Sequence, residues 1–195
     1  MPITEIKSYS RPTTDVAFFA EPSTAGKTAE FIAYKEAATT SGDWVQTYTI
    51  SEDGLQQIVT NIFQTIDALS AFESAASIQM AAVVRAYTVS TGAPDGPLST
   101  VQSGIDAPFA QTVTYSFPAE SNLVPEVANI MVATGSAQNR LTLHNATATL
   151  ATATYVYTDS ADYNMHKFSD SSFIQRFSSE LIAAGCVRTI AYAMV

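Results

Sequence analysis

The stretch that decides the predicted fold is Ser51–Phe72, SEDGLQQIVTNIFQTIDALSAF. Its apolar residues fall three and four positions apart, which is the spacing of one face of an amphipathic helix; they are Leu55, Ile58, Val59, Ile62, Phe63, Ile66 and Leu69. Asp53 and Gln56 have the spacing of a capping box, and acidic residues in a first turn interact favourably with the helix dipole. We therefore predict a helix over residues 54–73 that packs on a sheet or on another helix.

A second stretch of this kind lies near the C-terminus. Ser169 or Asp170 is placed to cap a helix over residues 171–184, and Gly185 is placed to end it. The apolar face of this helix would consist of Phe173, Ile174, Phe177, Leu181 and Ile182. A strand is predicted to follow from Cys186 to the end of the chain.

Each predicted helix lies between two predicted strands, in segments 44–90 and 147–195. These segments are either two related halves of a duplicated chain or two unrelated helices on one sheet, and the sequence leaves both alternatives open. Strand patterns are predicted at 30–37, 44–50, 77–90, 111–117 and 141–158, the last as one bent strand or as a hairpin. The predicted fold class is α+β, with a mainly antiparallel sheet or sandwich and two helices packed on it.

Two segments carry no periodic pattern. Residues 1–29 contain three prolines around one apolar patch and predict an extended N-terminal arm, which leaves residues 30–195 as a single α+β domain. Residues 91–110 contain three prolines and three glycines and predict a long irregular loop, a kind of segment that often binds a partner. The predicted assembly contacts in the arm and loop are Val16, Phe18, Phe19, Pro94, Asp95, Pro97, Ile105 and Phe109.

Composition disfavours several classes of function. The chain has 18 acidic and 9 basic residues and a net charge of −9, so it would repel a phosphate backbone, and we expect no direct, sequence-specific binding of nucleic acid. The basic residues are scattered, no run reaches the length of about 20 apolar residues needed for a membrane helix, and the N-terminus lacks the apolar run of a signal peptide. We therefore expect no membrane partner and synthesis in a cytoplasm.

Cofactor and metal motifs are absent from the sequence. A single cysteine, Cys186, cannot form an intrachain disulfide or a cysteine-rich zinc site, and it is predicted to be a small buried hydrophobe. Neither G-x-G-x-x-G nor a Walker motif occurs, which argues against nucleotide chemistry. We expect no cofactor, no metal and no catalytic residue of a recognisable class.

The remaining candidates for chemistry are the two histidines. His144 lies in a predicted strand, whereas His166 follows Asp159 and Asp162 closely. A carboxylate beside a histidine is the minimum arrangement for general base catalysis. The same two aspartates are oxygen donors of the kind that bind divalent cations, although the spacing of an EF-hand is absent; a solvated acidic turn is the simpler interpretation.

Charged residues make up only 14% of the chain, against about a quarter in an average globular protein. A surface with so little charge is poorly protected against association, which predicts a homo-oligomer. Together with the arm and the loop, this composition predicts a non-enzymatic structural subunit of a self-assembling particle. In general character the chain is similar to virion proteins of tailed bacteriophages, such as a tail-tube or capsid-associated subunit, which implies other structural subunits as partners and a location in the virion.

Two alternatives from other classes stay open. One is a small, ferredoxin-like, dimeric α+β enzyme that uses His144 or His166 with a carboxylate in a pocket between sheet and helices. The other is a ligand-binding or adhesion module that displays residues 91–110.

Overall fold

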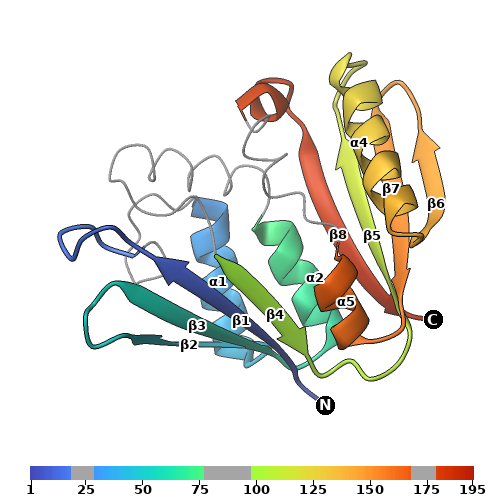
Figure 1. Cartoon of the computed structure of the whole chain (residues 1–195). Helices are drawn as coiled ribbons and strands as arrows, with labels where there is room; N and C mark the ends of the chain where they lie inside the picture. The colour runs from blue at the N-terminus through green and yellow to red at the C-terminus, as the bar shows by residue number, and fades with distance from the viewer. Residues whose placement is uncertain (19–28, 77–97, 168–178) are drawn as a thin grey trace.

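A computed structural model of the chain describes residues 1–18, 29–76, 98–167 and 179–195. Figure 1 shows two four-stranded antiparallel sheets with helices packed against them, which confirms the α+β prediction. Sheet A has the strand order β2-β3-β1-β4 and is formed by β1 (Ile3–Ser10), β2 (Trp44–Ile50), β3 (Gln56–Phe63) and β4 (Ser99–Ser103). Sheet B has the order β6-β7-β5-β8 and is formed by β5 (Phe109–Ser116), β6 (Leu141–Ala146), β7 (Leu150–Tyr157) and β8 (Val187–Met194).

The described helices are α1 (Ala29–Ser41), α2 (Ile66–Ala75), α4 (Leu123–Ala137) and α5 (Ser160–His166). In each half the chain runs strand, helix, strand, strand, helix, strand, and the two sheets have the same strand order. This is the ferredoxin-like arrangement, present twice. The repeated unit therefore begins at β1 and at β5, and it is larger than the predicted segments 44–90 and 147–195.

The prediction of a helix over residues 54–73 is wrong in its first part. Residues Gln56–Phe63 form β3, and only Ile66–Ala75 is helical. Gln57 and Asn61 point into the protein beside Val59 and Phe63, so the alternation of a strand is hidden because two of its buried positions are polar. The Asp53 carboxylate accepts from the Leu55 N–H at 2.9 Å in a tight turn, and the true cap of α2 is Thr65, whose hydroxyl accepts from the Ala68 N–H at 3.1 Å.

The predicted arm and loop are also corrected. Residues 3–10 form β1, which pairs with both β3 and β4 inside sheet A, so the prediction of an arm over residues 1–29 is wrong there. Within the predicted loop, residues 99–103 form β4 and β5 begins at Phe109. Side chains at alternate positions of β1 face the interior, as expected for a strand. Among them, Ile3 and Glu5 are 4% and 5% exposed.

Other predicted elements have mixed outcomes. Residues 30–37, predicted as a strand, lie in α1, because Phe31 and Ala38 form one buried helical face. The strands predicted at 44–50 and 111–117 are confirmed, and the stretch 141–158 is the hairpin β6–β7. The strand predicted at 77–90 and most of the helix predicted at 171–184 lie outside the described residues. Residues 179–183 are helical, Gly185 ends this segment with φ 67°, and β8 follows as predicted.

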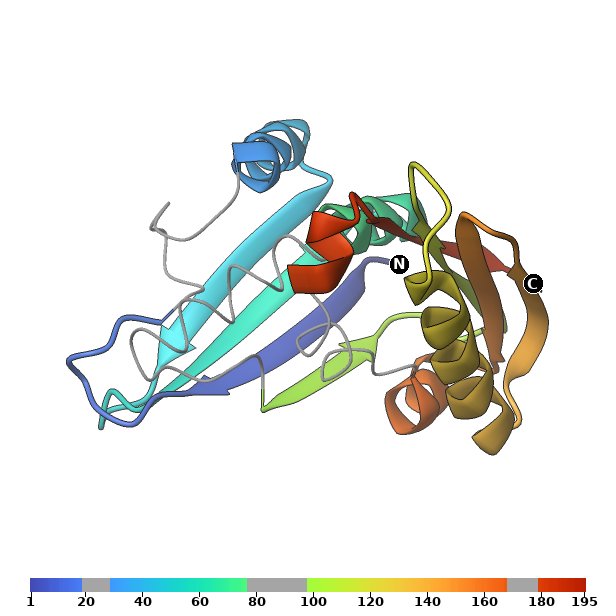
Figure 2. The ribbon, with the colours of Figure 1, turned by 90° about the horizontal axis from the view of Figure 1, so that it is seen from above.

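In each half, one helix forms hydrogen bonds to an edge strand of the other half's sheet. The Ser74 hydroxyl on α2 accepts from the Ile190 N–H at 3.0 Å and donates to the Ile190 carbonyl at 2.9 Å, on the edge strand β8. The Asn164 amide on α5 accepts from the Gln102 N–H at 2.8 Å and donates to the Gln102 carbonyl at 2.6 Å, on the edge strand β4. As Figures 1 and 2 show, α2 and α5 thus lie where the two sheets approach each other. Buried apolar side chains from both halves form one core.

Within the described ranges, no helix has both the length and the apolar character needed to cross a membrane.

Candidate functional site

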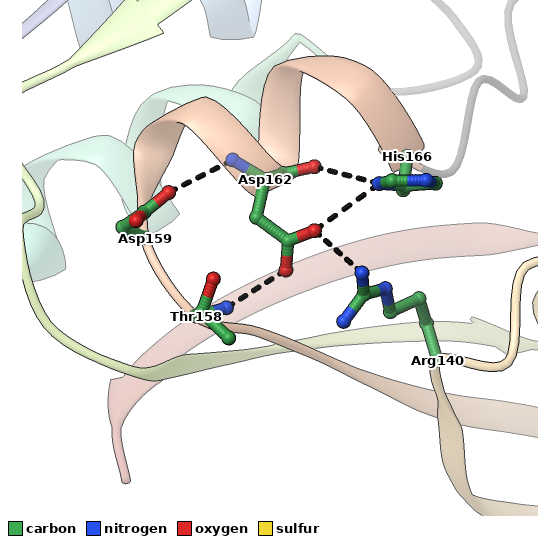
Figure 3. Close-up of polar contacts among 5 residues, drawn as sticks. All are labelled: Arg140, Thr158, Asp159, Asp162 and His166. Atoms are coloured by element: carbon green, nitrogen blue, oxygen red, sulfur yellow. Dashed lines mark hydrogen bonds and ion pairs between the residues drawn. The ribbon is translucent and has the colours of Figure 1, made fainter.

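The short helix α5 brings the predicted carboxylate and histidine together, as Figure 3 shows. The Asp159 side chain caps the helix by accepting from the Asp162 N–H at 2.8 Å, so this aspartate has a structural task. Asp162 and His166 lie one turn apart on the same face of the helix, and His166 Nδ1 is 3.1 Å from Asp162 Oδ1.

The carboxylate of Asp162 is held by three groups. Arg140 Nη2 donates to Oδ1 at 2.6 Å, the Thr158 N–H donates to Oδ2 at 2.8 Å, and His166 provides the third contact. Partial burial by itself would raise the pKa of Asp162, but the Thr158 N–H and the positive charges of Arg140 and His166 more than offset it and hold this pKa below its usual value. Asp162 is therefore ionised at neutral pH.

The proton position on His166 follows from its partners. Nδ1 lies 3.1 Å from the Asp162 carboxylate and 3.3 Å from the Asp162 carbonyl, and both of these oxygens are acceptors only. Nδ1 must therefore carry a hydrogen, and in the neutral ring Nε2 carries the lone pair. The side chain is 33% exposed, so a base at Nε2 is within reach of a small molecule.

The second histidine does not form such a pair. His144 lies on β6 next to Ala153 of β7 and is exposed. No hydrogen bond joins it to a carboxylate of the described segments. Of the two predicted candidates, the structure thus favours His166.

A second group of polar side chains lies on the inner face of sheet A, where no sequence pattern had indicated a site. Gln46, Asn61, Glu5 and Gln102 stand side by side across the four strands, in register. Asn61 Oδ1 accepts from Trp44 Nε1 at 3.1 Å and from Gln46 Nε2 at 3.0 Å, while its Nδ2 donates to Glu5 Oε2 at 3.1 Å. We call Glu5, Lys7, Gln57, Asn61 and Gln102 the inner polar face.

Lys7 carries the positive charge of this face. Its Nζ lies 3.0 Å from Glu5 Oε2 and 5.1 Å from the centre of the Phe72 ring. Burial alone would lower the pKa of Lys7, but the carboxylates of Glu5 and Glu73 outweigh it, and the pKa lies above its usual value. The ammonium group is therefore charged at all physiological pH values.

Two tyrosines adjoin the inner polar face where the two halves meet. The hydroxyl groups of Tyr163 and Tyr192 lie 3.1 Å apart, and Gln111 Nε2 donates to Tyr192 at 2.9 Å. Burial raises the pKa of both tyrosines, and the carboxylate of Glu73 acts in the same direction. Both hydroxyl groups therefore stay protonated and act as neutral hydrogen-bonding groups.

The predicted assembly contacts are not collected in one place. Ile105 and Phe109 are 4% and 0% exposed, and they pack in the core of their own chain. Phe18 is also buried and has the Arg11 guanidinium 4.5 Å from its ring centre, whereas Val16 is half-buried. Phe19, Pro94, Asp95 and Pro97 lie outside the described residues.

Within the described residues, neither the cysteine nor a cluster of metal-binding side chains gives a further candidate site. Cys186 is buried as predicted, and burial raises the pKa of its thiol to about 11, so it is a poor nucleophile at neutral pH. In the part of the chain that the structure describes, no group of three or more His, Cys, Asp or Glu side chains is arranged to hold a metal ion.

Comparisons with known proteins give remote similarities. No protein-family model and no curated protein matches the sequence. Among solved structures, a proposed monooxygenase from Fusobacterium nucleatum is 14% identical over 97% of this chain and 90% of its own, with a TM-score of 0.28. A proposed monooxygenase from Lactobacillus acidophilus is 12% identical over 100% and 93%, with a TM-score of 0.29, and a proposed chlorite dismutase is 9% identical over 99% and 94%, with a TM-score of 0.30.

These comparisons correct the functional prediction. The similar structures are named for oxygenase and dismutase activities, and none of those given above is a virion component. The prediction of a non-enzymatic phage subunit is therefore wrong. The virion location depended on that prediction and has no other support. The identities and TM-scores are too low to transfer any activity to this chain.

Proposed function

We propose that this protein is an enzyme with two ferredoxin-like halves, in which Asp162 and His166 act as a general acid–base pair. The observation that carries the proposal is the 3.1 Å contact between His166 Nδ1 and an Asp162 carboxylate that Arg140 and Thr158 hold in place. A fixed carboxylate that selects the Nδ1–H tautomer leaves Nε2 as the base, which is the arrangement that supports proton transfer in many hydrolases and isomerases.

The chemistry of the pair is the movement of one proton. His166 Nε2 accepts a proton from a weakly acidic C–H or O–H of the substrate, and the imidazolium that forms is stabilised by the ionised Asp162. The same proton is then returned to the substrate or to water. Arg140 and Asp162 are positioning residues in this scheme, because they act through His166.

The proposal is tested by following proton transfer directly. Wild-type protein is incubated in D₂O with α-keto acids and 1,3-dicarbonyl compounds, and exchange of their acidic C–H is followed by NMR. We expect accelerated exchange of at least one compound, and a loss of about 10²–10⁴-fold in His166→Gln. His144→Gln is the matched control and should keep the wild-type rate. Equal rates in both variants, or no acceleration by the wild type, would contradict the proposal.

We also propose that the chain is one domain with two related halves. The buried side chains of both halves belong to one core, and each half supplies a helix that bonds to the edge strand of the other sheet. Separate expression of residues 1–106 and 107–195 should give chains that unfold, or that associate only when mixed.

A second proposal concerns self-association through the outer face of sheet A. The outward positions of its four strands carry isoleucine, valine, threonine and serine, with Gln56 as the one further polar residue, and none of them is charged. Ile6, Val45, Ile58 and Val101 on this face are 39%, 43%, 46% and 50% exposed. An uncharged face on a chain of net charge −9 is the surface on which a second copy meets the least repulsion.

Charge substitutions test whether this face, and not another part of the surface, forms the contact between two copies. Val101→Glu should shift a dimer toward monomer in sedimentation equilibrium, because two copies would bring like charges into an apolar contact. Val187→Glu on the outer side of sheet B, where the native side chain is 52% exposed, is the control and should leave the equilibrium unchanged. A monomeric wild type, or equal effects of the two variants, would contradict the proposal.

A further inference from the structure

The inner polar face of sheet A contains a buried amide group with no partner among the described residues. Gln57 on β3 is 0% exposed, and neither its Oε1 nor its Nε2 has a hydrogen-bond partner among the described residues. A glutamine amide has two donor hydrogens and two acceptor lone pairs, and buried groups of this kind are nearly always paired in folded proteins. The Gln57 amide therefore has hydrogen-bonding capacity that no described residue uses.

A second unpaired donor lies on the same face. Gln102 on β4 is 4% exposed, and its Nε2 has no partner within the described ranges, although its backbone N–H and carbonyl both bond to Asn164. Gln102 stands next to Glu5 and Gln57 stands next to Tyr9, so Lys7 occupies the β1 position between the two pairs. The amide groups that have no partner among the described residues thus lie on both sides of Lys7, whose side chain is 18% exposed.

The groups around these amides are already engaged. Glu5 Oε2 accepts from both Asn61 and Lys7, and Asn61 Oδ1 accepts from Trp44 and Gln46. This network fixes the face, so it cannot rearrange to satisfy Gln57 without losing bonds that it has. Preorganised polar groups beside unpaired ones are the usual construction of a small-molecule site.

Aromatic side chains border the same face. Phe72 of α2 lies with its ring centre 5.3 Å from Trp44 and 5.1 Å from Phe63, and Phe31 and Tyr34 of α1 extend the group. This aromatic group would pack against a flat ring, and its polar neighbours are the Asn61 amide at Trp44 and the ammonium groups of Lys7 and Lys35.

We propose that the inner polar face of sheet A binds a small, neutral, aromatic molecule that carries a hydrogen-bond acceptor next to a donor, such as a carboxamide or a lactam. The adjacent acceptor and donor match the two functions of the Gln57 amide, and the ring packs against the Phe72 group. A neutral ligand fits because Lys7 is already paired with Glu5. This proposal does not depend on the Asp162–His166 pair, although Gln102 of the inner polar face bonds to Asn164 on the same helix, α5.

The single tryptophan allows the proposal to be tested without knowledge of the natural ligand. Trp44 is 1% exposed and bonds to Asn61, so a molecule on the inner polar face changes its fluorescence. Benzamide and 2-quinolinone are the probes, and ethylbenzene, which lacks both polar functions, is the comparison compound. We expect saturable fluorescence changes and a rise in Tm with the two probes. Binding of ethylbenzene should be at least tenfold weaker.

Substitution of the amide provides the decisive comparison. Gln57→Leu removes an unpaired buried amide, so the Tm of the free protein should rise, while the Tm shift caused by benzamide should be lost. Gln56→Leu, on the exposed side of the same strand, is the matched control and should keep the benzamide response. His166→Gln should also keep it, which separates this site from the proposed acid–base pair. A lower Tm for Gln57→Leu, an undiminished benzamide response in that variant, or no response in the wild type would overturn the proposal.

Discussion

The two sheets share one design and differ in what they bury. Ile3 pairs with Phe63 in sheet A as Phe109 pairs with Tyr157 in sheet B, and Glu5 pairs with Asn61 as Gln111 pairs with Tyr155. On the inner face of sheet B, β7 holds alanine and tyrosine opposite β5, while Gln111 on β5 and Arg188 on β8 are buried polar side chains. The equivalent positions of sheet A hold glutamine and asparagine beside a charged pair.

The two inner faces differ in how many polar side chains they bury. Burial of apolar and aromatic side chains stabilises sheet B, whereas buried polar groups of sheet A cost free energy unless they are paired. Sheet B buries Gln111 and Arg188 on its inner face, whereas sheet A buries Glu5, Gln57, Asn61 and Gln102. The larger set of buried polar groups in sheet A is the feature that the proposed ligand site uses.

The largest expected effect is the loss of stability when a side chain is removed from the core of sheet B. Phe109 has ring centres of Tyr157, Tyr163 and Tyr192 at 5.6, 5.8 and 6.1 Å. Phe109→Ala should lower the free energy of unfolding by about 3–5 kcal/mol, measured by urea denaturation. Ile3→Ala at the equivalent position of sheet A should cost less, near the lower end of the about 2–5 kcal/mol range for aliphatic residues. A larger loss for Ile3→Ala would mean that sheet A is the stabilising half.

The next effect concerns the charged pair of sheet A. Lys7→Met leaves the Glu5 carboxylate buried without its partner and should cost ~3 kcal/mol in urea denaturation. The raised pKa of Lys7 means that its contribution is complete below the ordinary lysine pKa and is lost only as pH rises through the higher folded-state value. The cost should therefore be constant from about pH 6 to pH 9.

A matched double variant also removes the Glu5 charge that Lys7→Met leaves without its partner. The double variant Glu5→Gln with Lys7→Met keeps an acceptor for Asn61 and should recover most of the lost stability. A double variant no more stable than Lys7→Met would show that the charge on Glu5 is not the cause of the loss.

A smaller pair of effects compares the two sheet edges. Asn164→Ala and Ser74→Ala each remove two hydrogen bonds to one residue of an edge strand, and each should cost about 1–3 kcal/mol. Hydrogen exchange should accelerate at the Gln102 amide in the first variant and at the Ile190 amide in the second. Unchanged exchange at either amide would show that the edge is held by other contacts.

The smallest expected effect is at the candidate acid–base pair. Asp162→Asn should cost up to about 1 kcal/mol at pH 7, because the ion pair with Arg140 is partly exposed. Since the folded-state pKa of Asp162 is lowered, its contribution is present above the ordinary aspartate pKa and disappears as pH falls through the folded value. The stability curves of wild type and variant should thus converge below about pH 4, and a difference that persists at pH 2 would assign the effect to packing.

The sequence predicted several elements correctly but missed others, among them α4, whose buried face is apolar. The β8 strand, the end of the last helix at Gly185, and the strands at 44–50 and 111–117 have ordinary apolar patterns and were predicted correctly. The strand β3 was missed because Gln57 and Asn61 occupy its buried positions, so the visible apolar spacing was that of a helix. This error therefore concerns the inner face of sheet A, where polar side chains are buried.

The candidate sites were predictable to different degrees. His166 was found because Asp162 precedes it by one helical turn, but Arg140 is 22 positions from Asp162 and only the fold brings them together. The inner polar face draws on four strands, and its one local signal is the alternation of Glu5 and Lys7 within β1. Cross-strand register, which a single sequence does not specify, was needed to assemble the rest.

The proposed enzyme is tested most directly by the protonation state of His166. Long-range ¹H–¹⁵N spectra of the imidazole rings distinguish the two neutral tautomers, and His144, which has no carboxylate partner among the described residues, serves as the internal reference. The structure predicts that neutral His166 carries its hydrogen on Nδ1 in the wild type and loses this preference in Asp162→Asn. A hydrogen on Nε2 in the wild type would contradict the assignment of Nε2 as the base.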